Sequence, residues 1–390
     1  MKKDPDMTTG HSPIDLLREL VAIPSVNPEL ADRPEIGGEH RMVEWLEAWL
    51  SRRGFSTSRV GPDPKRPNLV ARLGGADARR TLLFESHLDT VGVVGFSGDP
   101  FALREEQGRL YGRGACDTKG PLAAFLAAID DEVLAALRAS SVELVLLGAI
   151  GEETGNLGAE QAVADGLRAD ETIVLEPTQL RIVNTHKGAC WFKAATRGRS
   201  AHGSDPGRGD NAILKMPAVW QAIEAATAEA ARTYAPSGLG TPTVSLGTIH
   251  GGTGTNIVPD ACAIQVDRRF LPGETCAAIL EDIRARLADV PGGVEITLLK
   301  EGRAFHTDPE ASLPQRLGQA LTAAGLEASG EGAAWCSDAG VLADACRETV
   351  VWGPGSITQA HTANEYIESG QLAIAIEVLR HFLSESFRDI

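Results

Sequence analysis

The chain has 390 residues, 43% of them hydrophobic and 23% charged, which is enough to bury a sizeable core and to predict two domains. Its formal net charge of -16 argues against nucleic acid as a main partner, because an acidic surface repels phosphates. The apolar runs are too short for a membrane span, and residues 1–13 lack the apolar core of a signal peptide. The six cysteines form no Cys-x-x-Cys pair. We therefore expect a cytoplasmic protein with reduced thiols and no membrane partner.

The first part of the chain alternates between helical and strand patterns. Residues 13–53 predict two helices separated by a Pro/Gly-rich loop at 23–38, and the Ala/Leu-rich stretch 121–137 predicts another helix. Strands are predicted at 68–73, 81–85, 142–149 and 172–175. Strands that alternate with helices indicate an α/β layer fold with a largely parallel sheet.

Near residue 185 the pattern changes. The predicted elements are a strand at 189–196, a helix at 210–231, strands at 243–249 and 261–269, a helix at 274–287 and a strand at 294–299. This β-α-β-β-α-β order is typical of the ferredoxin-like unit. Helix and strand signals resume at 313–324, 349–352 and 365–383. We therefore expect one α/β domain, residues 1–184 and 298–390, interrupted by a small domain at 185–297.

Side chains that suit a metal ion follow several of the predicted strands. They are His87, Asp117, Glu153, Glu176 and His361. Imidazole nitrogen and carboxylate oxygen are zinc ligands, and five of them suit two ions that share one carboxylate. Any one of these residues alone is more often an ordinary packed or solvated side chain. Together, in Gly-rich stretches and mostly at strand ends, they predict a dinuclear metal site in an enzyme.

Two further carboxylates have predicted roles. Asp89, two residues after His87, can accept the second N–H of that imidazole and fix its tautomer. Glu152 and Glu153 are adjacent, so on an extended strand end their side chains would point opposite ways. One of the two can then bind metal while the other acts as general base toward the attacking water.

These motifs resemble the dinuclear zinc aminoacylase/carboxypeptidase family of M20-type peptidases, which includes acetylornithine deacetylases, succinyl-diaminopimelate desuccinylases and glutamate carboxypeptidases. The resemblance runs in the family's order over nearly the whole chain. Its motifs are Ser-His-Leu-Asp-Thr-Val at 86–91, the segment 112–120, Gly-Glu-Glu-Thr-Gly at 151–155, Glu-Pro-Thr at 176–178 and Ala-His-Thr-Ala-Asn-Glu at 360–365. It implies a zinc-peptidase-like mixed, largely parallel sheet flanked by helices, with an inserted ferredoxin-like α+β lid and dimerisation domain.

The resemblance also implies a role for each site residue. Asp117 would bridge two zinc ions, with His87 and Glu176 completing one site and Glu153 and His361 the other. The same resemblance implies a cis peptide bond at Asp117–Thr118. In addition, Glu152 would be the base that activates the water, and Asp89 would orient the histidine ligand.

The predicted inserted domain carries motifs of the same family. The segment Gly-Arg-Ser-Ala-His-Gly-Ser at 198–204 resembles the lid motif whose histidine, here His202, reaches the neighbouring subunit's active site and stabilises the oxyanion. Segments 251–259 and 267–269 resemble those whose Asn and Arg hold the substrate carboxylate, which implies Asn256 and Arg269. Arg268 is less favoured because the family pattern is Asp-x-Arg. The implied assembly is a homodimer through the inserted domain.

The implied reaction is hydrolysis of the amide bond of an N-acyl amino acid or dipeptide with two divalent metal ions, zinc or alternatively cobalt. Segments 353–361 and 335–340 most resemble the acetylornithine deacetylase branch, whereas Glu176 in place of Asp is seen in desuccinylases and carboxypeptidases. The substrate order is therefore N-acetylornithine-type deacetylation, then succinyl-diaminopimelate desuccinylation, then dipeptidase or carboxypeptidase activity. A non-catalytic metal-binding relative is the alternative of another class, and it should lack a ligand or the base.

Overall fold

The computed structural model describes residues 12–388 except 62, 75–76 and 234–237. Most of the N-terminal segment 1–13, which we expected to lack a signal peptide, lies outside the described residues. The chain divides into two compact units. The first consists of the residues up to Asn184, Thr307–Glu331 and the residues from Ser337 onward, and the second consists of Thr185–His306 and Gly332–Cys336. The predicted domain bounds at 185 and 297 stay a prediction.

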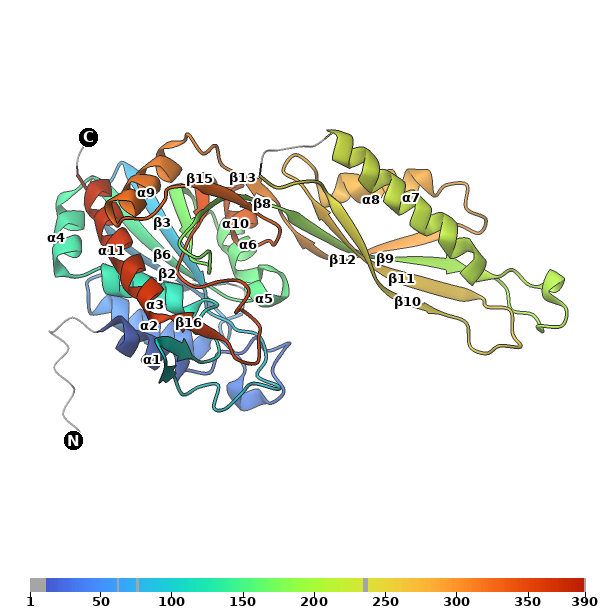
Figure 1. Cartoon of the computed structure of the whole chain (residues 1–390), viewed down its shortest axis with the longest axis horizontal. Coiled ribbons are helices and arrows are strands. Elements are labelled where there is room, and N and C mark those ends of the chain that lie inside the picture. The colour runs from blue at the N-terminus through green and yellow to red at the C-terminus, as the bar shows by residue number, and fades with distance from the viewer. Residues whose placement is uncertain (1–11, 62, 75–76, 234–237, 389–390) are drawn as a thin grey trace. The chain divides into compact units, whose positions relative to one another are not determined.

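The first unit is built on a mixed nine-stranded sheet, of which β13 and the adjoining ends of β8 and β14 are residues of the second unit (Figure 1). Its strand order is β1-β2-β6-β3-β7-β15-β8-β13, and β14 pairs with β8. The central strands β6, β3, β7 and β15 are parallel, whereas β1, β2, β8 and β13 pair antiparallel, which confirms the predicted largely parallel sheet. The strands are β1 (Ser56–Val60), β2 (Asn68–Gly74), β3 (Arg80–His87), β6 (Val142–Ala149), β7 (Ala169–Val174), β8 (Ile182–His186), β13 (Phe305–His306), β14 (Gly330–Ala333) and β15 (Cys346–Val351).

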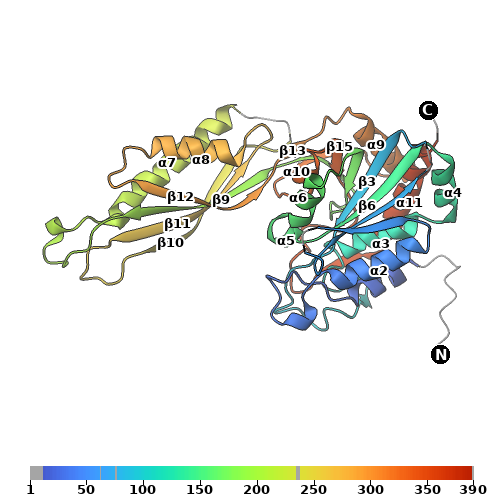
Figure 2. The same ribbon diagram turned by 180° about the vertical axis from the view of Figure 1, so that it is seen from behind.

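Helices cover both faces of this sheet (Figures 1 and 2). Alternate residues such as Leu82 and Phe84 of β3 pack with α1, α2, α3, α4, α9 and α11 in one large core, while α6 and α10 contact each other against β6 and β15. The helices are α1 (Pro13–Val21), α2 (His40–Ser51), α3 (Lys119–Ala128), α4 (Asp131–Ala139), α5 (Glu152–Gly155), α6 (Leu157–Ala164), α9 (Ser312–Ala323), α10 (Ala339–Leu342) and α11 (Ser369–Ser386), with a 3-10 turn at Pro34–Ile36.

Two local predictions for this unit were wrong or incomplete. The single helix expected at 121–137 is two helices, α3 and α4, because the Asp130 side chain accepts the amide of Val133 and so begins a new helix. A small antiparallel sheet was also not predicted, because its three-residue strands are too short for a periodic signal. It comprises β4 (Arg104–Glu106), β5 (Arg109–Tyr111) and β16 (Tyr366–Glu368), in the order β16-β5-β4.

The second unit has a separate four-stranded antiparallel sheet and two helices, in the predicted β-α-β-β-α-β order. The sheet order is β10-β11-β9-β12, and α7 and α8 pack on it around a core that includes Phe192 and Ile264. The predicted ferredoxin-like arrangement is therefore confirmed. Its elements are β9 (Gly188–Arg197), α7 (Ala212–Thr233), β10 (Thr243–Gly251), β11 (Ala261–Phe270), α8 (Cys276–Arg286) and β12 (Val294–Gly302), with a 3-10 turn at Pro206–Arg208.

The expectation that all six cysteines are reduced thiols is corrected in this core. Cys190 on β9 and Cys276 at the start of α8 form a disulfide, with their Cα atoms 5.5 Å apart. Both residues are fully buried. Since 86 residues separate them, their proximity follows from packing α8 on the sheet and leaves no spacing motif in the sequence.

Among the described residues, no helix combines the length and the apolar composition that crossing a membrane requires.

Gly148 of β6 provides a test of how tightly the sheet supports the residues beyond β3. A Cβ added at Gly148 would lie 2.9 Å from Cδ1 of Leu88, the buried residue between His87 and Asp89. We expect Gly148→Ala to lower the free energy of unfolding by about 1–3 kcal/mol through overpacking. Gly370→Ala is the matched control, because nothing lies within 4 Å of a Cβ there. Urea unfolding measures both, and a Gly148→Ala variant as stable as the control would contradict the prediction.

Candidate metal centre

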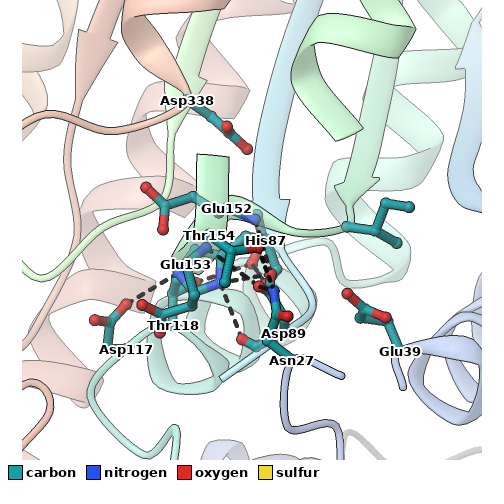
Figure 3. A network of polar contacts seen from close by, with 12 residues as sticks. Asn27, Glu39, His87, Asp89, Asp117, Thr118, Glu152, Glu153, Thr154 and Asp338 are labelled. Carbon is teal, nitrogen blue, oxygen red and sulfur yellow. Dashed lines mark hydrogen bonds and ion pairs between the residues drawn. The ribbon is translucent and has the colours of Figure 1, made fainter. Parts of the chain in front are cut away.

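The five predicted metal ligands come from segments that the first unit brings together. Three of them, His87, Asp117 and Glu153, are labelled in Figure 3. His87 is the last residue of β3, Glu153 lies in α5 just after β6, and Glu176 follows β7. These three strands are parallel neighbours, so their carboxyl ends lie at one edge of the sheet. Asp117 comes shortly before α3, and His361 lies in the loop between β15 and β16. The Asp117–Thr118 peptide bond is cis, as the resemblance implied.

The five side chains form two groups that share Asp117. In the first group, Nε2 of His87 lies 3.0 Å from Oδ1 of Asp117 and 3.8 Å from Oε1 of Glu176. In the second group, Nε2 of His361 lies 3.2 Å from Oδ2 of Asp117 and 3.0 Å from Oε2 of Glu153. Within each group the ligand atoms all lie within 4.8 Å of one another. The two oxygens of Asp117 therefore face different groups, which is the arrangement expected of a bridging carboxylate.

The residues present fit a pair of divalent cations. Burial, with the nearby charge of Asp117, raises the pKa of Glu176 well above its usual range. Hydrogen bonds to Asp117 and Glu153 raise the pKa of His361 to about 10. Oε1 of Glu153 is buried without a hydrogen-bond partner. Three carboxylates crowded in a buried site require positive charge between them, and two imidazoles with three carboxylates are a donor set that zinc accepts.

Asp89 connects the His87 segment to α5 through its side chain. Its carboxylate accepts the amide N–H of Glu152 and that of Glu153, each at 3.2 Å, and the Asn27 side-chain amide at 2.8 Å. Nδ1 of His87 lies 3.0 Å from the backbone carbonyl of Asp89, and the nearest carboxylate oxygen is 3.6 Å away. The imidazole therefore hydrogen-bonds to the backbone carbonyl of Asp89, while the carboxylate accepts the amides of the two glutamates and so caps their turn.

Glu152 is the first residue of α5 and not the end of an extended strand, so the expected local geometry was wrong. Gly151, at φ +70°, lets the chain turn directly from β6 into this short helix. Successive side chains on a helix still diverge by about 100°, so Glu152 and Glu153 point in different directions. Burial, followed by the charges of Glu153 and Asp338, raises the pKa of Glu152 well above its usual range. A raised pKa makes this carboxylate a stronger base than an ordinary glutamate.

A second set of buried polar residues, which sequence reasoning did not assign, adjoins Glu152. Asp338 is fully buried and accepts the Asn156 side-chain amide at 2.8 Å, and burial raises its pKa to about 6. Glu85 of β3 is also buried, and burial with the charge of Asp338 raises its pKa well above its usual range. Asp338 lies inside a recognised motif. Glu85 follows the apolar run of β3, a strand whose residues from Leu82 to His87 are all buried, so no alternation marks it.

Asn27 is the other site residue that the sequence analysis missed. It is fully buried, and its side-chain amide also donates to Oγ1 of Thr154 at 3.1 Å (Figure 3). The residue lies in the Pro/Gly-rich segment that we interpreted as a loop, where no periodicity marks an inward-facing side chain. Asn27 therefore ties a loop near the N-terminus to both the Asp89 and α5 segments.

The three predicted substrate-contacting residues all lie in the second unit. His202 is exposed, and its Nδ1 accepts the amide N–H of Ser204 at 3.2 Å, which leaves the proton of the neutral ring on Nε2. The amide of Gly203 donates to the carbonyl of Asn256 at 2.7 Å, so the His202 and Asn256 loops lie together.

The two neighbouring arginines of β11 differ in their surroundings. The Arg268 side chain is 2% exposed and pairs with Glu274 at 2.8 Å, whereas the Arg269 side chain is 26% exposed and pairs with Asp267 at 2.9 Å. An arginine that is already buried in an ion pair has little capacity for a ligand. Arg269 therefore has more capacity for a ligand than Arg268, and its role in substrate binding stays a prediction.

Comparisons with known proteins agree with this geometry. Residues 83–385 match the model of peptidase family M20/M25/M40. The chain is 33% identical to acetylornithine deacetylase of Myxococcus xanthus, covering 94% of this chain and 96% of that protein, and 32% identical to the same enzyme of Erwinia tasmaniensis, covering 95% and 97%.

Solved structures show the same fold at lower sequence identity. A tripeptidase from Staphylococcus aureus has a TM-score of 0.77 at 21% identity, covering 98% of this chain and 100% of that one. An M20 family metallo-carboxypeptidase from Sulfolobus solfataricus has a TM-score of 0.76 at 19% identity, covering 96% and 99%.

The hydrogen bonds to Asp89 predict a stability cost when its charge is removed. In Asp89→Asn the new amide group must face one of the donors that now point at the carboxylate, namely Asn27 and the amides of Glu152 and Glu153. We expect a loss of about 1–3 kcal/mol in the free energy of unfolding, measured by urea unfolding of chelator-treated protein. Asp99→Asn is the control, because Asp99 caps the amide of Phe101 at an exposed position. Equal stability of the two variants would contradict the prediction.

Proposed function

The chain belongs to peptidase family M20/M25/M40, as its motifs predicted, and on that basis we propose that it hydrolyses the amide bond of an N-acyl amino acid. The observation that carries the proposal is the pair of three-residue ligand groups that share Asp117 beside the half-buried Glu152. The family and its deacetylase relatives make the chain a hydrolase, and N-acetylornithine-type deacetylation is the proposed reaction.

We assign two divalent ions, zinc or alternatively cobalt, to the two ligand groups. His87 and Glu176 would hold one ion, Glu153 and His361 the other, and Asp117 both. When bound, such ions polarise the substrate carbonyl and make a water molecule acidic enough to attack at neutral pH.

Glu152 is the proposed general base. It takes a proton from the attacking water and delivers it to the leaving amine, and its raised pKa supports this role because it makes the carboxylate a stronger base. Asp89 supports the step by holding the amides of Glu152 and Glu153, so the base and a ligand keep a fixed spacing.

The second unit would supply the groups that recognise the substrate. We propose that the Nε2–H of His202 donates to the oxyanion in the active site of a partner subunit, and that Asn256 and Arg269 hold the substrate carboxylate. This requires a homodimer through the second unit, which stays a prediction.

The substrate order rests on the relatives and on one ligand. Acetylornithine deacetylases match over nearly the full length at 31–33% identity, and this favours an acetyl group and a basic amino acid. Glu176, seen in place of Asp in desuccinylases and carboxypeptidases, favours succinyl-diaminopimelate or a dipeptide as the second candidate. A non-catalytic relative is disfavoured because the chain keeps all five ligands and the base. A cytoplasmic location and a role in amino-acid biosynthesis belong to the same proposal.

Metal-dependent amine release from N-acetyl-L-ornithine is the first test. Zinc- or cobalt-loaded protein is expected to turn over this substrate, and chelator-treated protein is expected to be inactive and to recover when metal is restored. N-succinyl-diaminopimelate and small dipeptides are assayed in parallel. Turnover of one of those in place of N-acetylornithine would keep the amide-hydrolase proposal and reject the deacetylase branch. Absence of turnover on all three, with metal bound, would favour the non-catalytic relative.

Glu152→Ala tests the base. Turnover is expected to fall by about 10²- to 10⁴-fold, the usual contribution of general acid–base catalysis, while metal content and unfolding behaviour stay unchanged. Glu160→Ala, at an exposed position on α6, is the control and should keep full activity. A Glu152→Ala enzyme that turns over at the control's rate would remove Glu152 from this role.

Mixed dimers test whether His202 acts in the partner's site. His202→Ala and Glu152→Ala chains are each expected to be inactive alone, but a mixed dimer contains one site with both an intact base and an intact partner histidine. Activity should therefore return on mixing. Mixing Glu152→Ala with His361→Ala is the control, because both changes damage the site of their own chain and each mixed dimer keeps two defective sites. Failure of verified mixed dimers of the first pair to regain activity would reject the arrangement in trans.

A further inference from the structure

The carboxylate of Glu365 lies close to the metal centre but belongs to neither ligand group. Its side chain is 1% exposed, in the segment that follows His361. It accepts hydrogen bonds from the amides of Gly114 at 3.1 Å, Cys116 at 2.9 Å and Asp117 at 3.0 Å. Three amides that converge on one carboxylate form an anion-binding nest, and here the anion is a side chain of the same protein.

Arg113 completes this arrangement. Its guanidinium donates to Oε2 of Glu365 at 2.6 Å, and its own side chain is only 3% exposed. A buried charge requires a partner, and here the positive charge and the three amides together satisfy the carboxylate. A carboxylate only accepts hydrogen bonds, so both of its oxygens can face the four donors. A neutral amide side chain would place its NH2 group against some of them.

Glu365 sits where two ligand-bearing segments diverge from a shared ladder. β5 and β16 pair antiparallel, with Tyr111 opposite Tyr366, and the amide of Gly112 continues the ladder by donating to the carbonyl of Glu365 at 3.2 Å. From this point one strand of the ladder leads to Asp117, and the other leads back to His361.

We propose that Glu365 is a positioning residue for the metal centre: by binding the amide of Asp117 from the His361 segment, it sets the separation of these two ligands. The inference rests on the proposed dinuclear site. A bridging carboxylate must direct one oxygen to each ion, so a small rotation of its backbone disturbs both sites at once. Partners behind metal ligands typically contribute about 10- to 100-fold to metal affinity.

Charge removal at Glu365 tests this role. Glu365→Gln keeps the shape of the side chain but places an NH2 group against donors, whereas Glu365→Asp keeps the charge. Glu368→Gln is the matched control, since Glu368 lies three residues further along, in an exposed ion pair with Arg109 at 3.0 Å. Zinc and cobalt binding to chelator-treated protein is measured by calorimetry, with the absorption spectrum of bound cobalt as a second readout. Circular dichroism and thermal unfolding of the metal-free variants report the fold separately.

Folded Glu365→Gln is expected to bind both ions about 10- to 100-fold more weakly and to change the cobalt spectrum. Glu365→Asp is expected to recover part of the metal affinity. Glu368→Gln is expected to bind both ions as the unaltered chain does. Unchanged affinity in folded Glu365→Gln would overturn the inference. If Glu365→Gln does not fold, Arg113→Lys decides instead, because it keeps the positive charge but loses the planar fork: weakened binding supports the inference and unchanged binding overturns it. If the unaltered chain binds no metal, the proposed function fails first, and this inference fails with it.

Discussion

Repulsion among buried carboxylates is the constraint on which the first unit depends. Asp117, Glu153 and Glu176 lie within a few ångströms of two imidazoles, and Glu152 adjoins them. Such a cluster is costly in a low-dielectric interior unless positive charge is held inside it. The two ligand groups would hold that charge on either side of Asp117, and the same crowding raises the pKa of Glu152 and Glu176.

Two further carboxylates, each with its own hydrogen-bond donors, hold the backbone of this unfavourable cluster in place. The Asp89 carboxylate accepts the amides of Glu152 and Glu153 and the side chain of Asn27. The Glu365 carboxylate accepts the amide of Asp117 and the side chain of Arg113. In both cases a buried carboxylate binds backbone amides next to ligands. Each links segments far apart in sequence, so the positions of the ligands depend on the packing of the whole unit.

The sequence predicted regular elements and motif residues well, and irregular connections poorly. The strand ending at His87 was recognisable because an apolar run ends in polar residues, and β9 to β12 were recognisable from their strand and helix patterns in order. The break between α3 and α4 was missed because an aspartate cap was hidden in an Ala/Leu-rich stretch. The Cys190–Cys276 pair was missed because no local spacing signals a contact made through packing.

The sequence by itself therefore determined the family, the layered α/β fold with its ferredoxin-like insert, and the identity of the candidate ligands and base, because these depend on residue types at local spacings. Only the tertiary structure decided that Asp117 presents one oxygen to each ligand group, that the carboxylate of Asp89 caps α5 while its backbone carbonyl faces His87, and that Glu365 supports Asp117. These facts depend on hydrogen bonds between segments up to about 250 residues apart, as in the bond from Asp117 to Glu365 at a separation of 248. Such directional contacts form only when the packed sheet brings the carboxyl ends of its strands together.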